Sequence, residues 1–491
     1  MNPWLAGDPV RGDLRRAAIH ALHVAQETAA RVPAYARFLR LAGYDPERLR
    51  GLDDFQRLPL TDHASYLARY PIEQRCREGE RPQMHLVMLG PGASLWPRFP
   101  DQDRALLQTY VAMLHEHFRV RERWTLLIVN LAAGAWRAGL LGPELAQRLF
   151  AEQRICGTVA TPGLSVGDTL LVVRQLGHHY DQIILVGYPS LLTELLEAGA
   201  RHGLDWSALN VGLCIGGEPL AEPERDRLLD WIGKDPERLE GLFALYGSAE
   251  VGGLLGYETP LCLLVRRLCA RVPALARSLF GGAALATLVQ YDPLDHFLET
   301  CQGEIVLTTR GGVPLVRYNT HDRGGLLSFE ELVARCRAHG LDLAAELRAR
   351  GHDPQRVRPL PLLYAHGRPD AVVVRGATVD AEQVRRVLER PSLRLVLSGR
   401  FQLGAVENPP GCTVLRIIAE LREGMAPREE LRRLCQYTVL RELQRLNTEF
   451  RAVYTAAAGR LEVELVLAPH GTLRPVGPTA PRTPQAVARL G

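Results

Sequence analysis

The segment Val211-Gly212-Leu213-Cys214-Ile215-Gly216-Gly217-Glu218-Pro219 decides the fold class of this chain. Its first five residues form a short apolar run that predicts a buried strand, which the two glycines and the proline then end. Comparable apolar runs occur on both sides of it, at residues 85–89, 124–131, 183–186, 242–246 and 304–307. Helical apolar spacing lies between several of them, at residues 101–118, 168–176, 191–202 and 222–232. This alternation predicts an α/β domain with mostly parallel sheets.

Two helical regions lie on either side of these alternating strands and helices in the sequence. Helical spacing covers residues 14–41, with an interruption at Pro33, and a charged helical stretch covers residues 328–358. Beyond that stretch we expect strands at residues 371–375, 393–397, 414–419 and 461–466 and helices at residues 380–388 and 428–446. The predicted organisation is a large N-terminal domain over residues 1–365 and a small α+β C-terminal domain over residues 366–491.

Composition and charge exclude several classes of protein. The 491 residues include 59 basic and 55 acidic ones, and the net charge of +4 is too even for a protein dominated by nucleic-acid contacts. No stretch approaches the roughly 20 apolar residues that cross a bilayer, and the charged N-terminal residues predict a cytoplasmic protein. The nine cysteines are scattered without a CxxC pair, which predicts reduced thiols. Lys234 is the only lysine, so the other 58 basic residues are arginines.

Two loops that follow predicted strands carry groups that suit a nucleotide. Paired glycines at Gly216 and Gly217 allow a ligand to approach the backbone closely, and Glu218 could accept from an amine edge. An ordinary tight strand exit explains that loop equally well. The second loop, at residues 245–253, offers the Tyr246 ring, the Ser248 hydroxyl and the Glu250 carboxylate among three glycines. Such a set could stack a base, touch a phosphate and hold Mg²⁺, which prefers oxygen ligands.

Two later segments supply a further candidate carboxylate and mark the boundary between the two predicted domains. Asp322 closes the segment at residues 314–322, and a carboxylate there could accept from ribose hydroxyls. The alternative is an ion pair between Arg317 and Asp322. Gly367-Arg368-Pro369-Asp370 lies between the two predicted domains, where it could form a hinge or a plain turn.

In this order and spacing, the four segments resemble the adenylate-forming superfamily, and within it the phenylacetate–CoA ligase-like proteins. Further phrases extend the resemblance over most of the chain, namely Val32-Pro33-Ala34-Tyr35, Leu58-Pro59-Leu60-Thr61, Gly187-Tyr188-Pro189-Ser190, Gly256-Tyr257-Glu258-Thr259-Pro260 and Asn447-Thr448-Glu449-Phe450. Members of this family activate a carboxylate with ATP to an acyl adenylate and usually pass the acyl group to coenzyme A. Their mobile C-terminal domain swings about a hinge between the two half-reactions.

The resemblance implies a role for individual residues of this chain. The implied nucleotide site places Gly216, Gly217 and Glu218 at the adenine border and Tyr246 on the purine face, and it also includes Gly247. Ser248 would lie near the α-phosphate, Glu250 would hold Mg²⁺, Asp322 would bind the ribose hydroxyls and Arg368 would reach the ribose or phosphate. Ser248 and Glu250 are the expected catalytic residues. The acyl pocket would form near residues 130–136 and 186–190. ATP and Mg²⁺ are the implied cofactors, and coenzyme A or a carrier protein is the implied acceptor. No nucleic-acid or membrane partner is expected. The resemblance leaves open whether the protein forms a homodimer.

The phosphate loop departs from the family pattern. The family has a Ser/Thr/Gly-rich loop that directs N–H groups and hydroxyls at phosphate oxygens, whereas this chain has residues 89–97, LGPGASLWP. Gly90 and Gly92 would permit a tight loop, and Ser94 supplies the one hydroxyl. Pro91 and Pro97 carry no N–H group. The loop is therefore predicted to be a degenerate version.

The C-terminal lysine of the family is missing. It would neutralise charge that develops between the carboxylate and the α-phosphate, and losing one such charge costs some 10²–10³ in rate. Arg474 or Arg482 could substitute only in part, because a guanidinium is not a point charge. His321 also stands where relatives have a glycine, and its side chain could crowd the nucleotide.

Two hypotheses follow. The first is a divergent adenylate-forming ligase that activates an aryl or acyl carboxylic acid with ATP for transfer to coenzyme A or a carrier thiol. The second is a catalytically lapsed relative that serves as a ligand-binding or scaffolding protein, or that uses its pocket for another acyl-transfer reaction.

Overall fold

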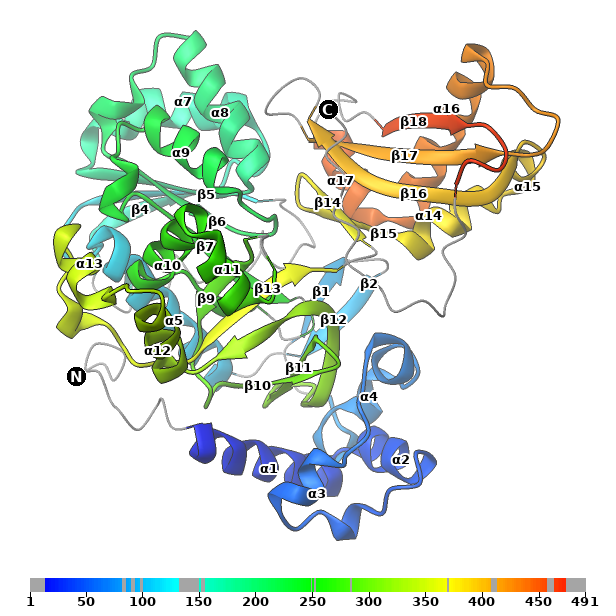
Figure 1. The fold of residues 1–491 in the computed structure, drawn as a ribbon, viewed down its shortest axis with the longest axis horizontal. Helices are drawn as coiled ribbons and strands as arrows, with labels where there is room; N and C mark the ends of the chain where they lie inside the picture. Colours follow the sequence, from blue (N-terminus) through cyan, green and yellow to red (C-terminus); the bar gives the residue numbers. More distant parts are fainter. Residues whose placement is uncertain are drawn as a thin grey trace.

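The fold was analysed in a computed structural model. It describes residues 14–81, 85–89, 93–97, 100–131, 150–151, 155–248, 250, 253–282, 285–368, 371–407, 413–456 and 463–473. A large α/β unit and a smaller α+β unit lie side by side (Figure 1). This arrangement confirms the predicted fold class.

The large unit is built on an 11-stranded sheet in the order β10-β11-β12-β13-β9-β8-β7-β6-β5-β3-β4. Its strands are β3 (Thr125–Asn130), β4 (Gly157–Ala160), β5 (Gln182–Gly187), β6 (Val211–Ile215), β7 (Leu242–Ser248), β8 (Gly253–Tyr257), β9 (Thr287–Gln290), β10 (His296–Cys301), β11 (Glu304–Thr309), β12 (Leu315–Leu327) and β13 (Leu362–Gly367). Strands β4, β3, β5, β6 and β7 run parallel to one another, and the pairs from β7 to β10 are antiparallel. A separate hairpin pairs β1 (His85–Leu89) with β2 (Ala93–Pro97).

The parallel strands are continuous apolar runs because both of their faces are covered. Every residue of β3 and β6 is buried. Side chains alternate between the faces, so Leu126 packs in the core under the helix that bears Leu192, whereas Leu127 packs in the core that contains Leu107. The helices of this part are α5 (Pro100–Phe118), α7 (Val166–Leu176), α8 (Pro189–Arg201), α9 (Glu222–Trp231), α10 (Pro260–Arg271), α11 (Pro273–Phe280), α12 (Phe329–Ala338) and α13 (Leu343–Ala349).

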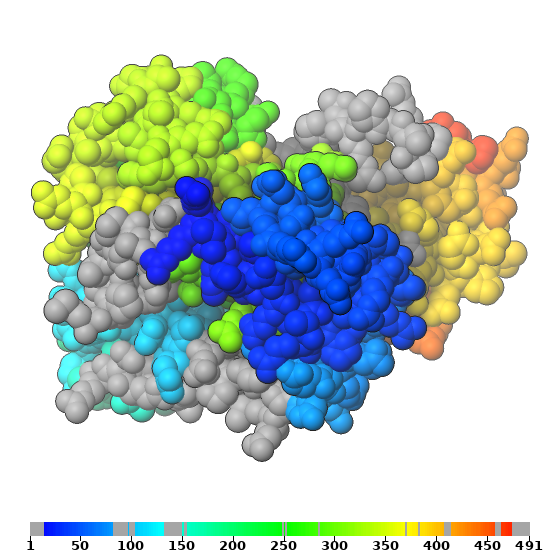
Figure 2. Space-filling view, turned by 90° about the horizontal axis from the view of Figure 1, so that it is seen from below, coloured from blue at the N-terminus to red at the C-terminus, as the bar shows by residue number. Residues whose placement is uncertain are grey.

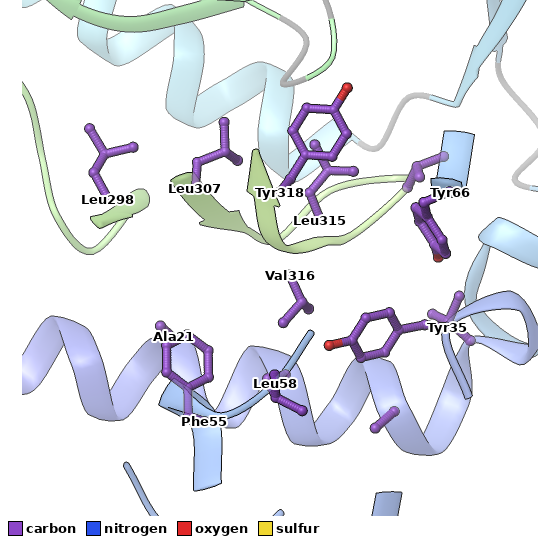
Figure 3. Packing of buried hydrophobic residues seen from close by; sticks show 14 of the residues in the cluster. Ala21, Tyr35, Phe55, Leu58, Tyr66, Leu298, Leu307, Leu315, Val316 and Tyr318 are labelled. Carbon is purple, nitrogen blue, oxygen red and sulfur yellow. The ribbon is translucent and has the colours of Figure 1, made fainter. Parts of the chain in front are cut away.

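The N-terminal helices form a layer below the antiparallel end of the sheet (Figures 1 and 2). They are α1 (Leu14–Arg31), α2 (Pro33–Leu41), α3 (Leu52–Gln56) and α4 (Ile72–Arg75). Side chains of this layer, including Phe55 of α3 and Leu58 just after it, form one buried core with Val316 of β12 (Figure 3). Backbone bonds fix the contact, since Thr61 N–H donates to the Arg317 carbonyl at 3.1 Å and Asn319 N–H donates to the Thr61 carbonyl at 2.7 Å.

The small unit has its own hydrophobic core and two sheets. Strands β14 (Ala371–Val374) and β15 (Ala377–Asp380) form a hairpin, and β16 (Leu397–Glu407), β17 (Thr413–Leu421) and β18 (Val463–Ala468) form a second sheet. Its helices are α14 (Ala381–Leu388), α15 (Pro391–Arg394), α16 (Glu429–Leu446) and α17 (Thr448–Ala456).

One predicted strand is wrong. Residues 393–397 were expected to be extended, but α15 covers Pro391–Arg394 and β16 begins only at Leu397. Proline at the first helical position is preset for a helical turn, and Leu393 of that turn is buried in the small core. No helix in the described ranges combines the length and apolar character needed to cross a bilayer.

Candidate active site

The predicted nucleotide-binding segments converge at one edge of the large sheet. Neighbouring parallel strands β6 and β7 run toward the same edge, where Ile215 pairs with Ala244 and a Cβ at Gly216 would lie 3.6 Å from Cβ of Leu245, the residue before Tyr246. Strands β12 and β13 are also neighbours, and Arg323 pairs with Gly367 in their register. Asp322 and Arg368 are therefore adjacent in space.

Tyr246, Asp322 and Arg368 form the centre of this site. The Tyr246 hydroxyl donates to Oδ2 of Asp322 at 2.6 Å, and Nε of Arg368 lies 3.3 Å from Oδ1 of the same carboxylate. Burial raises the pKa of Asp322, although Tyr246 and Arg368 oppose the change. Burial, and then the charge of Asp322, raises the pKa of Tyr246 well above its ordinary value. Both carboxylate oxygens thus have protein donors.

Two further side chains lie at the site without having been assigned a role from the sequence. Tyr318 of β12 extends away from the N-terminal helices (Figure 3), and burial followed by repulsion from Glu250 raises its pKa. Glu449 belongs to α17 of the small unit, where Oε2 accepts from Thr378 N–H at 3.0 Å. Burial raises the pKa of Glu449 to about 7, with Glu250 adding to the rise and Arg368 opposing it. Only the phrase at residues 447–450 indicated that this region mattered.

Glu250 provides carboxylate oxygens of the type that Mg²⁺ prefers. The described part of the chain contains no group of three His, Cys, Asp or Glu side chains placed to hold a metal ion. A magnesium ion at Glu250 would therefore need oxygens from a nucleotide or water to complete its shell.

Glu218 makes contacts other than the predicted adenine contact. Its Oε1 accepts from Ser190 Oγ at 3.1 Å and from the Gly376 N–H of the small unit at 2.7 Å. Its Oε2 lies 3.3 Å from the donating Ser190 N–H. Burial raises the pKa of Glu218. Gly217 has a φ of +80°, and a Cβ there would lie 2.8 Å from Cε1 of Tyr188, so the second glycine is required by packing.

The sequence alternative of an Arg317–Asp322 ion pair is wrong. Nε of Arg317 lies 3.2 Å from Oε2 of Glu299, and Nη1 donates to the Leu58 carbonyl at 2.8 Å. Arg317 therefore ties β12 to β10, two strands away in the sheet, and to the N-terminal layer, which leaves Arg368 as the cationic partner of Asp322.

His321 has its ring between two carboxylates. Nε2 lies 3.3 Å from Oδ2 of Asp62, and Nδ1 lies 3.3 Å from Oε2 of Glu304. The φ of His321 is +60°, a conformation that glycine adopts with little strain, so a glycine would fit the backbone at this position. These contacts engage the imidazole away from Asp322.

Part of the predicted site lies outside the described residues. Gly90, Gly92, Arg474 and Arg482 belong to that part. Ser94 is described as the backbone partner of Met88 in the β1–β2 hairpin, and Ser248 ends β7 opposite Gly253. Gly247 packs so closely on Gly253 that a Cβ would overlap the Gly253 carbonyl.

The predicted acyl pocket is described only in part. Residues 132–136 lie outside the described ranges. Asn130 is buried and uses its amide for structure, donating to the Gly163 carbonyl at 3.1 Å and to Thr169 Oγ1 at 2.6 Å. Residues 186–190 run from the end of β5 into α8, where Ser190 bonds to Glu218.

The single lysine lies far from this edge. Nζ of Lys234 donates to Oδ1 of Asn210 at 2.8 Å, and burial lowers its pKa. Asn210 precedes β6, whereas the site follows the other end of that strand, and five residues at about 3.3 Å each separate the two ends by about 16 Å. Lys234 is therefore a structural residue that does not replace the missing lysine.

No protein-family model and no curated protein sequence matches this chain. Solved structures do match its fold. The structure of 2-hydroxyisobutyryl-CoA ligase with 2-HIB-AMP and CoA in the thioesterification state has a TM-score of 0.62 at 14% identity, over 97% of this chain and 90% of that one. The same ligase in the postadenylation state with R3-HIB-AMP has a TM-score of 0.51 at 16% identity, over 96% of this chain and 88% of that one. The chain therefore has the fold of the adenylate-forming acyl-CoA ligases.

Proposed function

We propose that the chain is a divergent adenylate-forming ligase that activates an aryl or acyl carboxylic acid with ATP for transfer to coenzyme A or a carrier thiol. The observation that carries the proposal is the contact of Asp322 with Tyr246 and Arg368 at the carboxyl-end edge of the sheet. Ligands of open α/β sheets bind at this edge. The three residues are those that the family resemblance assigns to base and ribose.

The residues present fit a nucleotide. Asp322 has acceptor oxygens for ribose hydroxyls, and Tyr246 has a ring that can lie against a purine. Arg368 supplies a planar donor group that suits ribose or phosphate oxygens. Glu250 would hold Mg²⁺, which would neutralise phosphate charge when bound.

The arrangement of the two units supports acyl transfer in particular. The similarity is higher to the thioesterification state of the neighbour than to its postadenylation state. β13 ends at Gly367 and β14 begins at Ala371, so the proposed hinge around Arg368 lies between the two units. In the proposal, residues 1–365 carry the nucleotide and acyl sites, and residues 366–491 rotate about this hinge.

A second candidate is a lapsed relative that keeps the fold for ligand binding, scaffolding or another acyl transfer. Lys234 favours it, because the one lysine of the chain is tied to Asn210 away from the site. A chain without the catalytic lysine could retain nucleotide binding while losing adenylation.

Two measurements separate these candidates. Thermal shift with ATP·Mg²⁺ tests nucleotide binding, and ATP–pyrophosphate exchange over a panel of aryl and fatty acids tests adenylation. We expect stabilisation of the wild type, its loss in Asp322→Asn and its retention in Asp230→Asn, where the substituted residue is exposed on α9. Exchange with any acid supports the ligase, and binding without exchange supports the lapsed relative. Absence of both binding and exchange contradicts the proposed nucleotide site.

A further inference from the structure

A surface cavity of about 500 Å³ lies between α9, α10 and the start of α11. Its size is within the range of sites that take small molecules. The charged residues that line it are Glu222, Asp226, Glu237, Arg267 and Arg271, and none of these five belongs to the candidate active site. The cavity therefore combines the dimensions of a small-molecule site with a charged lining.

Arg267 is the buried cation of this cavity. It is 7% exposed, and its Nη1 contacts Oδ1 of Asp226 and lies 3.3 Å from Oε2 of Glu222. Nη2 of the same guanidinium is buried and has no hydrogen-bond partner among the described residues. Because a buried charged donor without an acceptor is costly, a ligand that brings an acceptor oxygen to Nη2 would be stabilised there.

Glu222 is held in place by the protein itself. It is 6% exposed, and its Oε1 accepts from Nε of Arg266 at 2.8 Å and from Nε of Arg225 at 3.3 Å. Arg266 is fixed in turn, since its Nη2 donates to the Leu220 carbonyl at 2.7 Å. The buried part of the cavity lining is therefore set by the fold, which lowers the cost of ordering it around a ligand.

Two other carboxylates of the cavity remain accessible to solvent. The side chains of Asp226 and Glu237 are 44% and 46% exposed. Asp226 contacts Arg267, whereas Glu237 contacts Arg271 and lies 3.5 Å from Nη2 of Arg350. Accessible carboxylate oxygens have acceptor capacity beyond these contacts and suit an ammonium group.

The charges decide which class of ligand fits. A phosphate or another lone anion would pair with Nη2 of Arg267 but would face three carboxylates of the same lining. A lone cation would contact those carboxylates and leave Nη2 unpaired. A molecule with one carboxylate and one ammonium group satisfies both sets. Pro223, Pro273 and Leu285 also line the cavity and suit an aliphatic side chain.

We propose that this cavity binds a free amino acid with an aliphatic side chain, with its carboxylate at Arg267 and its ammonium group at the Asp226 and Glu237 carboxylates. Asp226 belongs to α9 and Arg267 to α10, so the bound amino acid would bridge the two helices. The inference is independent of the proposed function, because no residue of the nucleotide site takes part in it.

Isothermal titration calorimetry without ATP tests the site, with glycine, alanine, valine, leucine and proline as probes. We expect valine and leucine to bind more tightly than glycine, and binding of neither would overturn the proposal. Leucinamide lacks the carboxylate and N-acetyl-leucine lacks the ammonium group. Each should bind about tenfold more weakly than leucine, or worse. A derivative that binds as well as leucine would contradict a site for a zwitterion.

Two alanine variants locate the binding. Ala270 is exposed near the C-terminal end of α10 and lines the cavity, so Ala270→Trp would fill the space without removing a charge and should abolish leucine binding. Ala338→Trp is the matched control, because Ala338 is exposed at the C-terminal end of α12. It should bind leucine like the wild type. Equal binding by both variants would place the amino acid elsewhere and overturn the site.

A second variant keeps the test decisive if Ala270→Trp fails to fold. Arg267→Lys retains a positive charge beside Asp226 but presents a single nitrogen, so leucine binding should weaken about tenfold or more. Arg337→Lys is its control, since Arg337 is exposed on α12. Unchanged leucine binding in Arg267→Lys would contradict the role of Nη2.

Discussion

The Tyr246 hydroxyl donates a 2.6 Å hydrogen bond to Asp322, although 76 positions separate the two residues in the chain. Tyr246→Phe removes this donor and leaves one oxygen of a mostly buried carboxylate without it. We expect the free energy of unfolding to fall by about 1–3 kcal/mol, measured by denaturant titration. The exposed Tyr437→Phe is the control and should have little effect. Equal effects of the two variants would show that the hydrogen bond contributes nothing.

The strand that carries Tyr246 depends on a buried ion pair. Nη2 of Arg225 lies 2.7 and 2.8 Å from the two Glu258 oxygens, and Glu258 also accepts from Ala244 N–H of β7 at 2.7 Å. Arg225→Met would leave Glu258 with one fewer cation, and removing one partner of a buried pair costs about 3–5 kcal/mol. Arg348→Met on α13 is an exposed control. If Arg225→Met/Glu258→Gln loses as much as the sum of the single variants, the two residues are not coupled.

The sequence alone predicted a strand correctly where every residue of that strand is buried. β3 and β6 are buried throughout and were predicted from their apolar runs alone. At residues 393–397 a similar apolar run was misread, because Pro391 starts a helical turn that precedes the strand. The local effect of one proline outweighed the pattern that follows it.

The residues that meet at the candidate site could be selected from the sequence only where they lie on a strand or directly after one. Tyr246, Asp322 and Arg368 were selected from their own segments, and the sheet then brings them together. The bond between Glu218 and Gly376 joins residues 158 positions apart and has no local signal. Glu449 was missed as a site residue because an acidic residue in the first turn of a helix is ordinary, and only its tertiary burial distinguishes it.

Glu250 should make nucleotide binding depend on magnesium. We expect ATP to stabilise the wild type more with Mg²⁺ than without it, by up to about 3 kcal/mol when ligand reaches 100 times its Kd. Glu250→Gln should abolish most of the magnesium increment while keeping the response to ATP alone. The exposed Glu240→Gln should behave like the wild type in thermal-shift measurements. A magnesium increment that survives in Glu250→Gln would assign the ion to other residues.

Glu449 should make the stability of the protein fall as the pH rises. Its pKa is 4.5 in the ordinary state and about 7 in the folded protein, so between these values the folded chain binds a proton that the unfolded chain releases. The stabilisation is complete below pH 4.5 and is lost as the pH rises through 7. At about 1.4 kcal/mol per pKa unit the full difference is up to about 3 kcal/mol.

The neutral variant Glu449→Gln isolates this contribution, because glutamine can still accept from the Thr378 N–H without carrying a charge. The unfolding free energy of the variant minus that of the wild type should increase from near its lowest value at pH 5 to a plateau above pH 8. Glu430→Gln is the matched control, since Glu430 is also in the first turn of a helix but is exposed. Its difference from the wild type should stay flat across the same pH range. A flat difference for Glu449→Gln as well would mean that its carboxylate is ionised at neutral pH, and that the Thr378 hydrogen bond and the attraction to Arg368 outweigh burial and the repulsion from Glu250.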